Sequence, residues 1–173
     1  MRAWIGLGAN LGEPATTFTE ALRRIDALAG IDVCRTSSIW RSAPVDAPGP
    51  DYHNAVAELH AHCTPQALLA SLLQIEKALG RTRPFRHAPR TIDLDFLLAQ
   101  DDEGAPVIVT TASLCLPHPR LHERAFALAP LAELDPALEV PGRGRIAALL
   151  EVCTGQPIER IAPPLAGWNG KNA

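Results

Sequence analysis

The sequence predicts an α+β fold in which an antiparallel sheet carries helices on one face and additional elements follow at the C-terminus. Four segments are typical of strands, by apolar alternation or by a short apolar run: 2–8, 32–42, 52–62 and 92–98. Two segments with helical spacing of apolar residues begin at Pro14 and Pro65. The resulting order, βαββαβ, is that of the ferredoxin-like fold.

The first half of the chain predicts a strand, a helix and a second strand. Strand 2–8 ends at a glycine-containing turn. The helix after Pro14 ends at Gly30, and its apolar positions recur at helical spacing: Phe18, Leu22, Ile25 and Leu28. Strand 32–42 leads into a loop rich in proline and glycine, 43–51.

The second half predicts two further strands of the sheet and smaller elements after them. Strand 52–62 alternates, with one apolar face formed by Ala55, Ala57, Leu59 and Ala61. The helix from Pro65 ends at Gly80 and precedes strand 92–98. A short strand near 106–109 and helices near 121–130 and 145–153 complete the list.

Length and composition restrict the class of protein. A chain of 173 residues predicts a single domain, which we place at 1–160, with a loosely held tail at 161–173. The formal net charge of −3 argues against a general nucleic-acid binder. Neither a membrane-spanning run nor a signal peptide is evident, so we expect a cytoplasmic protein. We also expect a monomer.

Two acids stand inside the apolar run Arg90-Thr-Ile-Asp-Leu-Asp-Phe-Leu-Leu98. Side chains two apart on a strand share a face, so Asp93 and Asp95 point the same way. Two neighbouring carboxylates repel unless a positive charge lies between them, and Mg²⁺ is a hard cation that prefers such oxygens. A solvent-facing ion network is the alternative reading, but the apolar flanks favour a metal site.

Four arginines precede this strand: Arg81, Arg83, Arg86 and Arg90. Guanidinium groups match phosphate geometry, and the low overall charge makes this concentration local. An acid pair beside an arginine cluster therefore predicts a site for a metal-bound polyphosphate.

Several other segments offer candidate ligand contacts. The glycines between Gly6 and Gly12 resemble a dinucleotide fingerprint, but the spacing is wrong and a tight turn is the preferred reading. His118 lies in a proline-rigidified turn, with Arg124 six residues later. In the proline-rich loop, Tyr52 offers an aromatic face and Asn54 a donor and an acceptor for a heterocycle, whereas Phe126 reads equally well as a core residue.

These segments together resemble the 6-hydroxymethyl-7,8-dihydropterin pyrophosphokinase family. The resemblance runs from Trp4-Ile-Gly-Leu-Gly-Ala-Asn-Leu-Gly12 to Ala125-Phe-Ala-Leu-Ala-Pro-Leu-Ala-Glu-Leu134, and its most specific part is Arg86-His-Ala-Pro-Arg-Thr-Ile-Asp-Leu-Asp95. Two shorter motifs support it, Pro50-Asp-Tyr-His-Asn-Ala55 and Leu116-Pro-His-Pro-Arg120. It implies transfer of pyrophosphate from ATP to 6-hydroxymethyl-7,8-dihydropterin, giving AMP and the pterin diphosphate in folate biosynthesis.

The resemblance also implies a role for individual residues. Asp93 and Asp95 would hold two Mg²⁺ ions along the triphosphate, and Arg81 and Arg90 would be catalytic residues on loops that close over it. The ATP contacts would be Arg83, Arg90, His118 and Arg124. The pterin slot would be formed by Ser42, Pro44, Val45, Tyr52, Asn54 and Phe126.

Two other functions remain as alternatives. One is a ferredoxin-like nucleotide-binding module without catalysis, although the chain has few aromatic residues and acids on its fourth strand. The other is a metal-dependent phosphohydrolase that uses the same acids, which leaves the loop 50–54 without a role.

Overall fold

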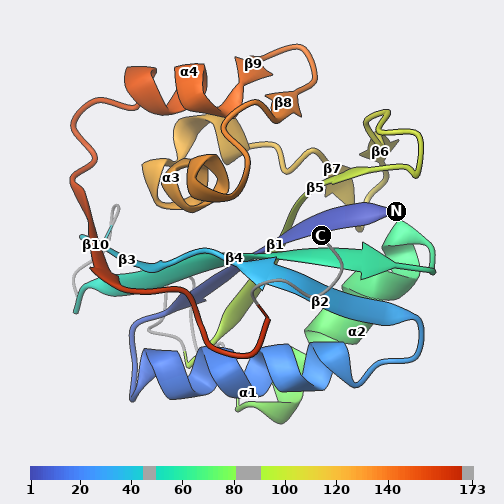
Figure 1. Ribbon diagram of the computed structural model, residues 1–173, viewed down its shortest axis with the longest axis horizontal. Helices are drawn as coiled ribbons and strands as arrows, with labels where there is room; N and C mark the ends of the chain where they lie inside the picture. Colours follow the sequence, from blue (N-terminus) through green and yellow to red (C-terminus); the bar gives the residue numbers. More distant parts are fainter. Residues whose placement is uncertain (45–49, 81–90, 169–173) are drawn as a thin grey trace.

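The computed structural model describes residues 1–44, 50–80 and 91–168 and shows an antiparallel sheet as its central element (Figure 1). The strand order is β10-β3-β4-β1-β5, and β2 also pairs with β4. The bounds are β1 Arg2–Ala9, β2 Ile31–Thr36, β3 Ile39–Ser42, β4 Tyr52–Ala61, β5 Asp93–Gln100 and β10 Ile158–Ala162. With α1 (Pro14–Asp26) and α2 (Pro65–Ala78) between them, β1 to β5 confirm the predicted βαββαβ order, with the second predicted strand present as two strands, β2 and β3.

The predicted second strand is broken into β2 and β3 at Ser37 and Ser38. The Ser37 N–H donates to the Val56 carbonyl at 2.8 Å, but the Val56 N–H donates to the Ser37 hydroxyl at 2.9 Å, so a side chain replaces a ladder carbonyl. The carboxylate of Glu133 then accepts hydrogen bonds from the Ser38 N–H, the Ser38 hydroxyl and Trp40 Nε1. A residue far along the chain therefore stabilises the bend.

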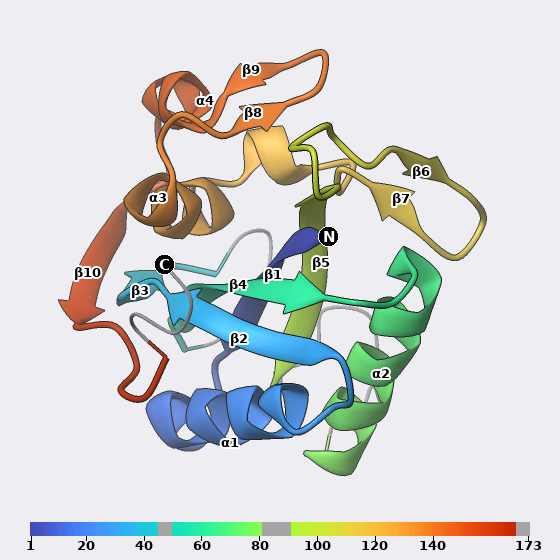
Figure 2. The ribbon, with the colours of Figure 1, turned by 45° about the vertical axis from the view of Figure 1, so that its right-hand side comes forward.

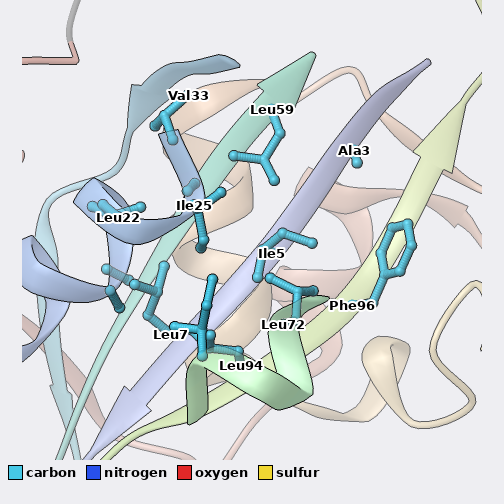
Figure 3. Packing of buried hydrophobic residues seen from close by; sticks show 14 of the residues in the cluster. Ala3, Ile5, Leu7, Leu22, Ile25, Val33, Leu59, Leu72, Leu94 and Phe96 are labelled. Carbon is cyan, nitrogen blue, oxygen red and sulfur yellow. The ribbon is translucent and has the colours of Figure 1, made fainter. Parts of the chain in front are cut away.

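Helices α1 and α2 cover one face of the sheet (Figures 1 and 2). Helix α1 buries Phe18, Leu22 and Ile25 of its predicted stripe, but it ends at Asp26, before the predicted Gly30, so the partly buried Leu28 lies outside it. Leu68, Leu72 and Ile75 of α2 are also buried. These side chains interlock with the apolar faces of β1, β4 and β5, as Figure 3 shows for Leu22, Ile25, Leu72, Ile5, Leu59 and Leu94. The alternation predicted for β4 is confirmed, because Ala55, Ala57, Leu59 and Ala61 all belong to this core.

The opposite face of the sheet is also covered, which the prediction of helices on one face omitted. A short 3₁₀ helix, η1 (Leu121–Glu123), precedes α3 (Ala125–Leu134), and α4 (Ile146–Val152) packs beside them. Their apolar side chains form a second, smaller core with residues of β1, β4 and β5: Trp4, Val56, Leu97 and Leu98. The helix predicted near 121–130 is thus two elements, because Arg124 is extended between them.

Two small hairpins complete the fold on this side: β6 (Val109–Thr110) with β7 (Cys115–Leu116), and β8 (Glu139–Val140) with β9 (Gly144–Arg145). In the described part of the chain, no helix combines the length and apolarity that crossing a membrane requires.

The C-terminal segment is attached to the sheet, and the predicted loose tail is wrong for its described part. Strand β10 pairs antiparallel with β3 and crosses the predicted domain end at residue 160. Leu165 and Trp168 are buried in the main core, and the Leu165 N–H donates to Thr36 Oγ1 at 3.1 Å. Two large apolar side chains therefore hold a segment whose proline and glycine content suggested a loose tail. Residues 169–173 lie outside the described residues.

Candidate active site

A cavity of about 310 Å³ opens on the α3 side of the sheet, where β1, β4 and β5 meet the start of α3. Its size lies at the lower end of the range for small-molecule sites. Its lining combines the two strand acids, two arginines, two aromatic side chains and buried polar groups. The lining residues that carry the argument below are Gly6, Gly8, Ser42, Tyr52, Asn54, Asp93, Asp95, Arg124, Phe126 and Gln156.

The floor of the cavity consists of two rows of residues that run across β4, β1 and β5, one centred on Gly6 and one on Gly8 of β1. In one row Gly8 of β1 pairs with Asn54 on one side and Asp93 on the other. Neighbouring strands lie about 4.8 Å apart, so the outer two residues of the row are about 10 Å apart at the backbone. A Cβ atom at Gly8 would meet Asn54 Oδ1 at 3.7 Å and Asp93 Cβ at 3.9 Å. The glycine therefore leaves open the space between these two polar side chains.

The acid pair lies on the cavity face of β5, as its spacing predicts. Asp93 and Asp95 both line the cavity, whereas Leu94 between them belongs to the core on the other face. The Leu94 N–H donates to the buried carboxylate of Glu76 at 2.6 Å, which ties this part of β5 to α2. The two candidate metal ligands therefore lie on a strand whose opposite face is fixed to α2 by this hydrogen bond.

Arg124 places a positive charge beside the acid pair. Its Nη1 lies 3.3 Å from Asp95 Oδ2, and its guanidinium lies 5.5 Å from the centre of the Phe126 ring. The Arg124 side chain is 21% exposed and that of Asp95 38%, so solvent reaches both. Such an accessible pair can exchange partners when a charged ligand arrives.

His118 lies beside this group but does not line the cavity. The backbone N–H of His118 donates to the Leu97 carbonyl at 2.7 Å, and its ring Nδ1 accepts from the backbone N–H of Arg120 at 3.2 Å. Burial lowers the pKa of His118; Asp95 opposes that shift, whereas Arg124 and Arg120 add to it. The ring is therefore neutral near pH 7, and the hydrogen bond at Nδ1 places its proton on Nε2.

Buried polar groups form the opposite wall. Asn54 Nδ2 donates to Ser42 Oγ at 3.0 Å, and both residues are more than nine-tenths buried. Tyr52 of β4 and Phe126 of α3 both line the same cavity. Phe126 also packs against the smaller core, so it is both a cavity-lining residue and a core residue, the two roles that the sequence left open.

The structure brings together most, though not all, of the predicted site residues. Pro44 follows the lining residue Ala43 but does not itself line the cavity. Val45, Arg81, Arg83 and Arg90 lie outside the described residues. In the part of the chain that is described, no cluster of three or more metal-ligating side chains occurs, so the two acids are the protein's candidate metal ligands there.

Several lining residues do not follow from the sequence pattern. Gly6 and Gly8 lie within β1, in agreement with the predicted strand 2–8, and of the three glycines in this segment Gly12, with a φ of +68°, has the conformation of the predicted tight turn. Their position before a helix could have suggested a ligand floor as well as a turn. Glu123 and Gln156 also line the cavity, and no local pattern in the sequence marks them.

The sequence matches the family described as 7,8-dihydro-6-hydroxymethylpterin-pyrophosphokinase (HPPK) over residues 4–136. It is 37% identical over 164 residues to the 2-amino-4-hydroxy-6-hydroxymethyldihydropteridine pyrophosphokinase of Synechocystis, covering 94% of this chain and 82% of the relative. It is 41% identical over 142 residues to the enzyme of that name from Methylorubrum extorquens, covering 82% of this chain and 87% of the relative.

Similar proteins also include longer ones, of which this chain spans less than half. A folate synthesis bifunctional protein of pea is 37% identical over 131 residues, 75% of this chain and 24% of the relative. The crystal structure of Plasmodium falciparum HPPK-DHPS superposes with a TM-score of 0.62 at 12% identity, covering 87% of this chain and 40% of that chain, and so supports the fold. The family match and the close relatives together show that the chain belongs to the HPPK family of transferases in folate biosynthesis.

Proposed function

We propose that this chain transfers the terminal pyrophosphoryl group of ATP to the hydroxymethyl oxygen of 6-hydroxymethyl-7,8-dihydropterin in a Mg²⁺-dependent reaction. One observation carries the proposal: a single cavity holds the acid pair and Arg124 on one side of Gly8 and the buried Asn54–Ser42 pair on the other. A polyphosphate suits the first side and a polar heterocycle edge the second. The family membership supports the same assignment.

The chemistry of the two acids fits magnesium. Asp93 and Asp95 present carboxylate oxygens from one rigid strand, which suits ions that take one or two protein carboxylates and complete their shell with phosphate and water. We assign two Mg²⁺ ions to this pair together with ATP. When bound, the ions neutralise the charge on the triphosphate and polarise the phosphorus that is attacked.

The remaining residues orient the substrates. Asn54 and Ser42 would bind the edge of the pterin, and Tyr52 and Phe126 would enclose its flat ring. His118 would donate from Nε2 to a phosphate oxygen, and Arg124 would leave Asp95 for a phosphate once the triphosphate is bound. The pterin oxygen forms a bond to the β-phosphorus as the α–β bridge breaks, AMP departs with the bonding electrons, and the hydroxyl proton passes to solvent.

Four residues enter this proposal from the family resemblance alone, since they lie outside the described residues. Arg81 and Arg90 are assigned to catalysis, Arg83 to ATP and Val45 to the pterin slot. Monomeric action is also part of the proposal, and sedimentation at micromolar concentration checks it.

The test is an incubation with ATP labelled in its γ-phosphate, Mg²⁺ and the hydroxymethyl pterin, followed by chromatography of both products. Transfer of the label to the pterin, in step with AMP, supports the proposed function. Release of labelled phosphate with ADP would favour the phosphohydrolase. Binding of ATP without any product would favour a nucleotide-binding module.

A further inference from the structure

The end of helix α4 and the following turn hold the short segment that carries Arg124. Cys153 Sγ donates to the His122 carbonyl at 3.7 Å, and Gln156 Nε2 donates to the Glu123 carbonyl at 2.8 Å. The Ala125 N–H in turn donates to Gln156 Oε1 at 3.0 Å. Burial, with a contribution from the Glu123 carboxylate, raises the pKa of the Cys153 thiol, so this thiol keeps the proton it donates.

The two hydrogen bonds of Gln156 fall on either side of Arg124. The Glu123 carbonyl belongs to the peptide group before Arg124, and the Ala125 N–H belongs to the one after it. With both groups held, the backbone of Arg124 is held at its φ of −119° and ψ of 96°, an extended conformation directly before α3. Arg124 is the N-cap residue of α3, but its side chain accepts no hydrogen bond from the helix. Gln156 therefore also satisfies the first N–H of that helix.

We propose that Gln156 is a positioning residue of the active site, which holds Arg124 against Asp95 and the Phe126 ring through the backbone. Three observations support this role: Gln156 lines the same cavity, Arg124 contacts both partners, and the two flanking peptide groups are bonded to one carboxamide. Gln156 stands beyond residue 136, where the family match ends, on the segment linking α4 to β10 (Figure 1). The site is therefore completed by a part of the chain outside that match.

This role depends on the proposed function only for its kinetic consequence. A poorly oriented guanidinium binds phosphate less well and stabilises developing charge less well, because catalytic groups must be held close to their productive geometry. Loss of the two hydrogen bonds is expected to lower kcat/KM about tenfold, the equivalent of about 1.4 kcal/mol.

The experiment compares Gln156→Met, which keeps about the same length and volume but cannot donate a hydrogen bond and accepts one only weakly, with Thr154→Ala as a matched control. Thr154 is exposed in the same turn and does not line the cavity. We expect about a tenfold loss of kcat/KM for Gln156→Met and less than a twofold change for Thr154→Ala. A Gln156→Met enzyme within twofold of the parent in kcat and both KM values would overturn the proposal.

A double-mutant cycle separates positioning from a general effect on the fold. If Gln156 acts through Arg124, adding Gln156→Met to an Arg124→Met protein changes the dissociation constant of a non-hydrolysable ATP analogue by less than twofold. If the loss of affinity in the double variant equals the product of the losses in the two single variants, Gln156 does not act through Arg124 and the proposal fails.

Hydrogen exchange of the Ala125 amide in the ligand-free protein gives a readout that does not need activity. Exchange at least tenfold faster in Gln156→Met supports the hydrogen bond; unchanged exchange refutes it. Should the parent protein form no AMP, the proposed function falls and the Ala125 exchange alone decides the role of Gln156. Should Gln156→Met fail to fold, Gln156→Glu replaces it: this variant keeps the acceptor, so retained protection of Ala125 supports the proposal and lost protection contradicts it.

Discussion

Replacement of Asn54 by alanine is expected to weaken pterin binding much more than ATP binding. The Asn54 side chain is buried at the β4 end of the row that crosses Gly8, and Asp93 marks the other end, about 10 Å away. One N–H of its side-chain amide donates to Ser42 Oγ. Its second N–H and its carbonyl oxygen can therefore bind the edge of a heterocycle.

The size of the effect follows from burial. A ligand group left without its buried hydrogen-bonding partner loses about 1–3 kcal/mol, which is about fivefold to about 150-fold in affinity. The Ser42 hydroxyl also loses its donor, so we expect the free energy of unfolding to fall by about 1 kcal/mol in the same variant. ATP, bound beyond Gly8, should change by less than threefold.

Calorimetric titration with the pterin and, separately, with a Mg²⁺–ATP analogue measures both affinities. Ser42→Ala is the matched control, because it removes the partner of Asn54 and leaves the amide in place; its pterin affinity should lie between those of the parent and Asn54→Ala. Equal losses for the two ligands in Asn54→Ala would refute the reasoning and make Asn54 a structural residue of the β3–β4 pair.

Three further changes test other parts of the structure. Asp95→Asn should abolish turnover. It should change the free energy of unfolding by less than about 1 kcal/mol, because the ion pair between Asp95 and Arg124 is partly exposed. Activity near that of the parent at ordinary Mg²⁺, or a much larger loss of stability, would contradict the metal assignment. Glu133→Ala should lower the free energy of unfolding by about 2 kcal/mol, because Trp40 and the chain bend both lose an acceptor; urea unfolding measures this, and an unchanged midpoint would be the contrary result. His118 has a lowered pKa, so the native protein binds fewer protons there than the unfolded chain and loses stability as the pH falls below the ordinary value of 6.5 towards the native one. Urea unfolding of His118→Gln between about pH 7 and about pH 5 should therefore show a smaller loss than the parent, and identical losses would count against the buried neutral ring.

Patterns confined to one element predicted their part of the structure well. The alternation of Asp93, Leu94 and Asp95 assigned the acids to one face, because the side-chain period of a strand is fixed by backbone geometry. The helix after Pro65 likewise starts and ends close to its signals, and Thr64 caps it by accepting from the Ala67 N–H.

Features that depend on distant contacts were not predictable in this way. The break at Ser38 is stabilised by Glu133 of α3, a partner that no local pattern around residue 38 indicates. Leu165 and Trp168 were expected in a loose tail because their segment is rich in proline, glycine and asparagine, whereas their burial depends on the surface against which they pack. The role of Gly8 could not be predicted for a related reason. A glycine inside a strand normally indicates only that the strand is weakened there, and its role becomes clear once its cross-strand neighbours, here two polar residues, are known.

The two apolar cores on opposite faces of the sheet give the molecule two units of unequal resistance to opening. Proteins open locally in cooperative units, and the unit that buries less apolar surface opens at lower free energy. Here that unit is the layer of η1, α3 and α4, because its core is the smaller one. A ligand held both by Asn54 on the sheet and by Phe126 on α3 would connect the two units. At a hundred times its dissociation constant it adds about 2.7 kcal/mol to the cost of opening the weaker one. Cleavage by a protease between residues 121 and 156 then becomes a measure of ligand occupancy.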